Sequence, residues 1–203
     1  MGLFDSIKNQ VTSQIKREAT KAVTNAAQNA SREIAKGRNH TESFTFASLP
    51  TGLDALKALP EASLDSAFKT TALCIAVLCN LEKDENATWE MLDYLKGPED
   101  VNGREKAFIK ERLAGKQYKT LSFFKGATPD NGYTPDTPYT ISVSENPYSF
   151  DEENWATLYV TSGGADSPRP IKLRRKPSTN QWFVNDIQCL ADIRIPTEQD
   201  AWA

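Results

Sequence analysis

Residues 63–81, SLDSAFKTTALCIAVLCNL, decide the fold, because Ala72 to Cys79 are apolar at every position. A helix that is apolar on all sides must be buried on all sides, so this stretch predicts the central core helix of a domain. A membrane span needs about 18 or more apolar residues, whereas Lys69 and Glu82 enclose a much shorter run. We therefore expect this helix in a globular core and not in a bilayer.

Two of the three cysteines, Cys74 and Cys79, lie on this predicted helix. Their spacing turns the side chains away from each other around the helix axis, so they cannot form the paired ligands of a C-x-x-C zinc or redox site. We expect both to be small buried side chains. The odd number of cysteines argues for a reducing compartment, and the N-terminus shows no signal-peptide pattern. We therefore expect a cytoplasmic protein.

The composition is that of an ordinary globular protein, with 203 residues, 39% apolar residues and a net charge of −3. This length allows one sizeable core and an appendage. Residues 1–40 hold seven basic side chains against three acidic ones, a balance of +4, so the remainder of the chain carries −7. A basic segment on an acidic body indicates an interaction role for the segment, and the small net charge disfavours nucleic acid as the partner.

The first 36 residues show an apolar side chain at every third or fourth position, without a proline, and Gly37 supplies a stop signal. The pattern predicts one long amphipathic helix over residues 1–37. Its large apolar residues come first and alanines follow, which suits burial in a lipid headgroup layer or in a partner's groove. The residues expected to insert are Phe4, Ile7, Val11 and Ile15, and those expected to make electrostatic contacts are Lys8, Lys16, Arg17 and Lys21.

The same pattern leaves other partners open for this segment. A helix of this kind also packs on its own body or on a second copy, which would make the protein a homo-oligomer. The opening residues MGLFDSIKNQVTSQI resemble the N-terminal amphipathic segment of phage-shock-type membrane-remodelling proteins. That resemblance implies contact with a membrane surface.

The rest of the chain divides at Gly115, where the spacing of apolar residues changes. Residues 38–52 are interpreted as a linker, in which Phe44 and Phe46 alternate as in a short strand. Residues 53–114 are predicted to be helical, with helices at 63–81, 88–96 and 103–113. After Gly115 apolar residues recur at every second position, as in β-strands. Strands are expected at 118–124, 139–143, 156–161, 170–176, 181–186 and 189–195.

Helices followed by a meander of strands predict an α+β fold. We expect a long N-terminal amphipathic helix, then a helical segment packed against a mostly antiparallel, curled β-sheet over residues 117–195, in a domain that spans 53–203. The short link at 177–180 predicts a hairpin between its two flanking strands. The aromatic residues expected to fill the core face of the sheet are Tyr139, Tyr148, Phe150, Trp155 and Trp182.

Two long pieces of the chain, KAFIKERLAGKQYKTLSFFKGATPDNGYTPDTPYTISV and PYSFDEENWATLYVTSGGADSPRPIKLRRKPSTNQWFVNDIQCLADIRIP, resemble a bacterial family classed as a domain of unknown function, as does the terminal DAWA. The resemblance covers about residues 49–203. It implies a fold unit and assigns no catalytic residues, and the basic N-terminal segment lies outside that unit.

Catalytic patterns are scarce in this sequence. The only histidine, His40, lies in the predicted linker, which excludes a Ser-His-Asp or Cys-His apparatus inside the body and disfavours histidine-based metal sites. The acidic run at 151–153 is more typical of a solvated loop or a helix start than of a pair of catalytic carboxylates. We expect no metal and no cofactor, and we favour a protein that is not an enzyme.

A basic stretch ends the strand expected at 170–176. Alternation places Lys172, Arg174 and Lys176 on one face of that strand, with Ile171 and Leu173 on the other. The three cations form a candidate surface for an anion or a partner. They would equally serve to keep an edge strand from aggregating.

Two functions follow from these patterns. The leading hypothesis is a non-enzymatic bacterial module that its basic amphipathic segment docks to a membrane surface or into an assembly. The alternative is a ligand-binding or enzymatic domain with a pocket between the sheet and the loops at 128–137 and 162–167. Within the second loop, SGGAD lacks the Gly-Lys-Ser/Thr of a phosphate loop, so we expect a wide hairpin loop there.

Overall fold

Helix α3 (Ala67–Leu78) lies at the centre of the fold, and every residue of it except Lys69 is buried. The computed structural model describes residues 39–202. Within them, α3 contacts all five strands of the sheet, together with α4 and α6. Ser66 caps its amino end by accepting a hydrogen bond from the Phe68 amide at 3.2 Å. The core helix predicted from residues 63–81 is therefore confirmed.

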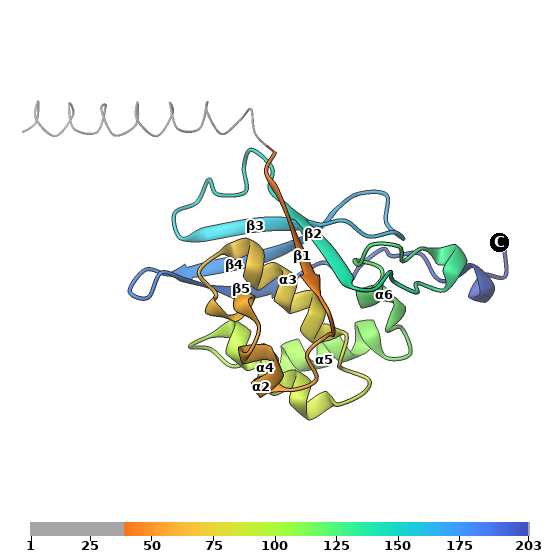
Figure 1. The fold of residues 1–203 in the computed structure, drawn as a ribbon, viewed down its shortest axis with the longest axis horizontal. Helices are drawn as coiled ribbons and strands as arrows, with labels where there is room; N and C mark the ends of the chain where they lie inside the picture. Colours follow the sequence, from red (N-terminus) through yellow and green to blue (C-terminus); the bar gives the residue numbers. More distant parts are fainter. Residues whose placement is uncertain (1–38, 203) are drawn as a thin grey trace, which may run out of the picture. The chain divides into compact units, whose positions relative to one another are not determined.

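One antiparallel sheet packs against α3, with the strands in the order β1-β2-β3-β4-β5 (Figure 1). The strands are β1 (Thr41–Phe46), β2 (Tyr139–Ser144), β3 (Trp155–Val160), β4 (Arg169–Lys176) and β5 (Gln181–Ile187). Alternate residues such as Ile141, Val143 and Leu158 are buried against the helix. The mixture of helices with an antiparallel sheet confirms the α+β class.

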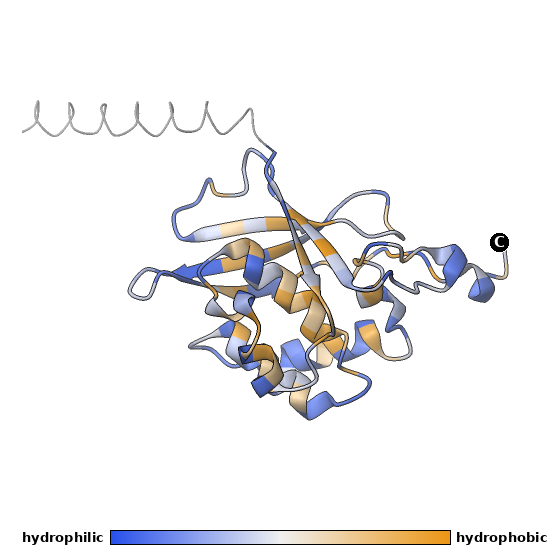
Figure 2. Ribbon diagram, in the orientation of Figure 1, coloured by the Kyte–Doolittle hydropathy of each residue, from blue (hydrophilic) through white to orange (hydrophobic). Residues whose placement is uncertain are grey.

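The described residues form four further α-helices, of which α4 and α6 contact α3: α2 (Leu53–Lys57), α4 (Glu85–Lys96), α5 (Gly103–Leu113) and α6 (Tyr118–Leu121). Their ends carry local signals, since Asp84 caps α4 and a capping box of Asn102 and Glu105 begins α5. Apolar residues gather along α3 and on the parts of its neighbours that meet it (Figure 2). No helix among residues 39–202 is both long and apolar enough to cross a lipid bilayer.

Strand β1 lies inside the range 38–52 that the sequence indicated as a linker. It pairs with β2 over its whole length, from Thr41 opposite Ser144 to Phe46 opposite Tyr139. Phe44 and Phe46 are buried in the common core, so these residues belong to the sheet and the linker interpretation is wrong for them. The body accordingly begins at His40 and not at residue 53.

Two of the expected strands are absent. Residues 118–121 form α6, because Gln117 donates to the Leu78 carbonyl at 3.2 Å and ties this segment to the end of α3. Residues 189–195 form no strand, because their backbone binds loops instead: the Arg194 amide donates to the Gly164 carbonyl at 2.9 Å. The long N-terminal helix expected over residues 1–37 lies outside the described residues.

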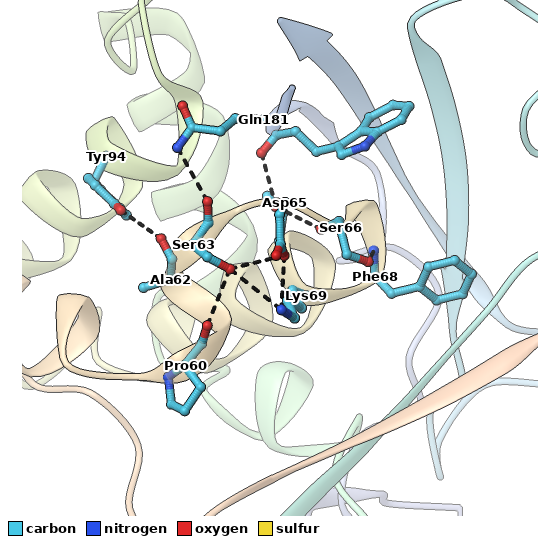
Figure 3. Close-up of polar contacts among 11 residues, drawn as sticks. Pro60, Ala62, Ser63, Asp65, Ser66, Phe68, Lys69, Tyr94 and Gln181 are labelled. Carbon is cyan, nitrogen blue, oxygen red and sulfur yellow. Dashed lines mark hydrogen bonds and ion pairs between the residues drawn. The ribbon is translucent and has the colours of Figure 1, made fainter. Parts of the chain in front are cut away.

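Polar contacts tie the amino end of α3 to its neighbours (Figure 3). The Trp182 amide of β5 donates to the Leu64 carbonyl at 2.8 Å, and the Thr70 hydroxyl donates to the Trp182 carbonyl at 2.9 Å. The Tyr94 hydroxyl of α4 donates to the Ala62 carbonyl at 2.7 Å. The turn before α3 therefore covers the outer edge of β5 at this point, and α4 also contacts β5.

Truncation of the core helix tests this arrangement. Leu73 is fully buried, and Leu73→Ala is expected to lower the free energy of unfolding by about 3 kcal/mol, since it removes buried methyl groups and leaves a cavity. Urea unfolding followed by circular dichroism measures the change. The control Glu90→Ala, at an exposed position of α4, should stay within about 0.5 kcal/mol of the wild type. Equal effects of the two changes would contradict a central role for α3.

Candidate functional site

Strand β4 lies between β3 and β5 and turns Ile171 and Leu173 into the core. The alternate residues Lys172, Arg174 and Lys176 project from the opposite, outer face of the sheet, as the sequence predicted. Because β4 is paired on both sides, protection of an edge strand does not explain the three cations. The three cations are therefore considered as a candidate binding surface.

Trp155 of β3 lies on the same outer face, opposite Arg174 in the register of the two strands. Nζ of Lys172 lies 4.6 Å from the centre of the Trp155 ring, and Cζ of Arg174 lies 5.3 Å from it. Both distances are within cation–π range. The expectation that Trp155 fills the core is wrong, because Ala156 takes that face. We call Trp155, Lys172, Arg174 and Lys176 the cationic face.

The charges of the cationic face are not neutralised by the part of the chain that the structure describes. There, neither Lys172, Arg174 nor Lys176 forms an ion pair with a carboxylate. Asp186 stands opposite Lys172 on β5, where its carboxylate accepts a hydrogen bond from Gln188 at 2.7 Å. The cationic face is therefore a positive patch on a body whose overall charge is negative.

A hollow of about 270 Å³ adjoins the cationic face at the β4–β5 hairpin, which projects at the left of Figure 1. Arg174 and Lys176 line it from β4, and Phe183 lines it from β5. Lys96 and Glu99, from the end of α4 and the loop that follows, line its other side. The hairpin end of β4 is hydrophilic in Figure 2. We call this space the cationic hollow.

Gly97 allows the loop after α4 to pass directly against Phe183. Its φ of +76° is rarely adopted by other residues, and a Cβ at this position would lie 2.4 Å from the Phe183 ring. A side chain at residue 97 would therefore push the loop away from β5. Gly97 and Pro98, which follow the last residue of α4, also set one wall of the cationic hollow.

The pocket expected at the loops 128–137 and 162–167 is an open hollow of about 510 Å³. Its polar groups are bound to one another, since Arg194 donates to the Asp166 carboxylate at 2.7 Å and its backbone amide donates to the Gly164 carbonyl. A ligand there would have to replace these bonds. Of the two hollows, the cationic one offers cations that are not ion-paired within the described residues.

The SGGAD segment fastens these loops together. The Gly163 amide donates to the Ser122 carbonyl at 2.8 Å, and a Cβ on Gly163 would lie 1.9 Å from the Ala127 carbonyl oxygen. The glycine is required for this close approach of two backbones. The segment forms the loop of the β3–β4 hairpin, which confirms that it is not a phosphate loop followed by a helix.

Side chains that could carry out catalysis are held in other roles. Burial raises the pKa of the Cys74 thiol to about 12 and that of Cys79 to about 12, and it also raises the pKa of Cys189. His40 is exposed at the start of β1, with its ring 5.3 Å from that of Phe68. Among residues 39–202, no group of three or more His, Cys, Asp or Glu residues is placed to hold a metal ion.

A serine beside a lysine, as in some nucleophilic enzymes, occurs before α3 (Figure 3). The Ser63 hydroxyl lies 3.0 Å from the Asp65 carboxylate and 3.5 Å from Nζ of Lys69. Lys69 is itself bound to Asp65 at 2.9 Å, and this hydrogen bond lowers the pKa of the Asp65 carboxyl. The serine therefore donates to a carboxylate whose lowered pKa makes it a weak base, and the cluster closes a turn.

Two aromatic residues expected in the core are exposed. Tyr148 and Phe150 lie on the loop between β2 and β3, and Phe150 contacts the rings of Phe68 and Trp182 at 6.4 and 5.8 Å. The acidic run at 151–153 is exposed in the same loop. The N-terminal candidates lie outside the described residues, so their roles stay predictions; they are Phe4, Ile7, Lys8, Val11, Ile15, Lys16, Arg17 and Lys21.

A family model described as "Domain of unknown function (DUF6935)" matches residues 48–197. The match agrees with the resemblance drawn from residues 49–203, and it leaves the similarity of the first 15 residues to phage-shock-type proteins as a prediction. No curated protein and no solved structure matches the chain. The cationic face and the cationic hollow both lie within the matched range.

The state of the three thiols is directly testable. A pKa near 12 leaves almost no thiolate at pH 8, and burial keeps reagents away. The native protein is therefore expected to show almost no reaction with DTNB at pH 8, whereas in guanidinium chloride all three thiols should react within minutes. Absorbance of the released thiolate measures both. Rapid reaction of even one thiol in the native state would contradict the described core.

Proposed function

We propose that this chain, which belongs to the family described as Domain of unknown function (DUF6935), is a non-enzymatic binding module that takes an anionic partner on its cationic face. One observation carries the proposal: the Trp155 ring has Lys172 at 4.6 Å and Arg174 at 5.3 Å, on the sheet face opposite α3. An aromatic ring between two cations fixes their positions before a partner arrives.

The contact with the Trp155 ring leaves Lys172 and Arg174 able to bind an anion. A guanidinium over an aromatic face keeps its N–H donors at its rim, where they can reach a carboxylate or a phosphate in two-point contact. Because Lys172 and Arg174 form no ion pair within the described residues, an anion would not have to displace a carboxylate. Holding the side chains in place also reduces the conformational entropy lost on binding.

The spacing and the surrounding charge limit the partner. Lys172, Arg174 and Lys176 follow one another at every second position of β4, so they stand roughly 7 Å apart along the strand. This row fits an anion with more than one charge. The acidic body disfavours a long nucleic acid, which would need an extended positive surface.

We further propose that residues 1–36 dock this module to a membrane surface or into an assembly, which includes an assembly of identical chains. The support comes from the sequence: large apolar residues at the start of the segment, and seven basic side chains against three acidic ones in residues 1–40. One amphipathic segment binds lipid weakly by itself. The cationic face of the body would then hold its partner at that location.

Charge reversal tests the proposed binding of anions. The double variant Lys172→Glu, Arg174→Glu is expected to bind inorganic pyrophosphate at least about ten-fold more weakly than the wild type, because each charge-assisted hydrogen bond contributes roughly 1.5–3 kcal/mol. Calorimetric titration of the full chain measures this, and affinity should fall as salt rises.

The matched control removes two exposed lysines from elsewhere on the body, with Lys83→Glu and Lys116→Glu. Both double variants keep the basic N-terminal segment, so the difference between them reports on the cationic face. The proposal fails if pyrophosphate does not bind the wild type at millimolar concentration. It also fails if both double variants weaken binding equally.

Sedimentation with lipid vesicles tests the docking of residues 1–36. Phe4→Asp with Ile7→Asp should abolish sedimentation of the full chain with vesicles rich in phosphatidylglycerol, because two charges enter the apolar stripe. The control Asn9→Asp with Gln10→Asp adds the same charges at polar positions of the pattern and should reduce sedimentation much less. If the wild type does not sediment with vesicles but runs as an oligomer, the segment serves an assembly and not a membrane.

A further inference from the structure

A second hollow, of about 240 Å³, lies next to the cationic hollow along β5. Apolar side chains of the loop before α5, of α5 and of β5 line it, and we call it the apolar hollow. They are Val101, Phe108, Ile109, Val184 and Ile187, and polar side chains complete the rim: Lys96, Arg104, Glu105, Asn185 and Asp186. Phe108 is 41% exposed although it is a large apolar residue on a helix. Exposed apolar surface around a concave site is a feature of ligand-binding grooves.

The two hollows are adjacent. Lys96, Val184 and Asn185 line both of them, so the cationic hollow and the apolar hollow adjoin at the middle of β5, and we treat them as one groove. Each hollow alone is smaller than the roughly 300–1,000 Å³ of typical small-molecule pockets, whereas the two together fall in that range. One ligand that occupies both must therefore be narrow and must carry a different chemistry at each end.

Charge is distributed unevenly between the two ends. Lys96 is almost buried and is ion-paired with Glu105 of α5, so its charge is compensated where the hollows meet. In the cationic hollow, Arg174 and Lys176 are exposed and have no ion-pair partner among the described residues, and the acidic side chain on its wall is that of Glu99. Besides the Lys96–Glu105 pair, the apolar hollow has one charge of each sign, Arg104 and Asp186, whereas Arg175 adds a third cation to the hairpin end. A negative group is therefore attracted to the hairpin end of the groove.

We propose that the joined hollows bind a small amphiphilic anion, with its phosphate or carboxylate head at Arg174 and Lys176 and its hydrocarbon tail between α5 and β5. The inference rests on the proposed function, because Arg174 and Lys176 belong to the cationic face. It adds the substrate class of that site: an acid that carries an unbranched alkyl chain. The tail covers Phe108, and burial of its methylene groups supplies affinity that charge alone does not.

A series of alkyl phosphates tests the tail. Butyl, octyl and dodecyl phosphate, each kept below the concentration at which it forms micelles, are titrated into the full chain by calorimetry. Affinity should rise along the series by up to roughly ten-fold for each two methylene groups, until the apolar hollow is filled. Equal affinity for all three compounds would overturn the inference, whereas binding of pyrophosphate would still support the cationic face.

Two variants separate head from tail. Phe108→Asp should remove the gain with chain length, so that dodecyl phosphate binding weakens far more than butyl phosphate binding, whereas Arg174→Glu with Lys176→Glu should weaken every compound by a similar factor. Phe150→Asp is the matched control for Phe108, since Phe150 is 43% exposed on the loop between β2 and β3 and lines neither hollow. Melting temperatures near that of the wild type confirm that each variant is folded.

A peptide with an apolar residue at a free C-terminus shares this chemistry and is the competing occupant. The inference is overturned if a peptide ending in leucine binds at least as tightly as octyl phosphate, or if Phe108→Asp and Phe150→Asp have equal effects on the alkyl series. A lipid in a membrane is distinguished in the same way. The double variant Arg174→Glu, Lys176→Glu is the test. If it still sediments with vesicles but no longer binds monomeric octyl phosphate, the groove binds a single dissolved amphiphile and not a lipid in a membrane.

Discussion

The burial of α3 on every side is the constraint on which the rest of this structure depends. Leu73, Ile75 and Val77 are fully buried, so no face of the helix can be left to solvent. The chain meets this requirement with strands on one side and with α4 and α6 on others. Only one face of the sheet is needed for that cover. The outer face is free to carry polar and charged side chains, and it is there that the candidate site lies.

The sequence predicted those parts of the fold that depend on local pattern. The core helix, α4, α5 and the strands from β2 to β5 each carry their own periodicity or capping residues. Strand β1 was interpreted as a linker because its partner is far away: Ser43 bonds to Ser142, 99 positions along the chain. The strands predicted at 118–124 and 189–195 from short alternation of apolar residues were wrong for a related reason. Such pieces become strands only where a neighbouring edge accepts them.

The candidate site was predicted in part. Alternation along β4 is enough to place Lys172, Arg174 and Lys176 on one face. Trp155 was missed because β3 has apolar or aromatic residues on both faces, and the register with β4 decides which of them meets the cations. The hollows could not be predicted either. They depend on the loop at Gly97 and on the position of α5 beside β5, which no local pattern encodes.

The contrast between Lys96 and the three cations of β4 explains how an acidic protein can keep a positive patch. Lys96 is almost buried, and a cation in that environment needs a partner such as Glu105, since desolvation costs several kcal/mol. Arg174 and Lys176 are exposed and Lys172 is half-buried at the surface. In water, two charges roughly 7 Å apart repel by only about 0.6 kcal/mol. The fold tolerates this small repulsion without neutralising it. In the proposed complex, an anion across the row would remove this repulsion and gain contacts held in place by Trp155.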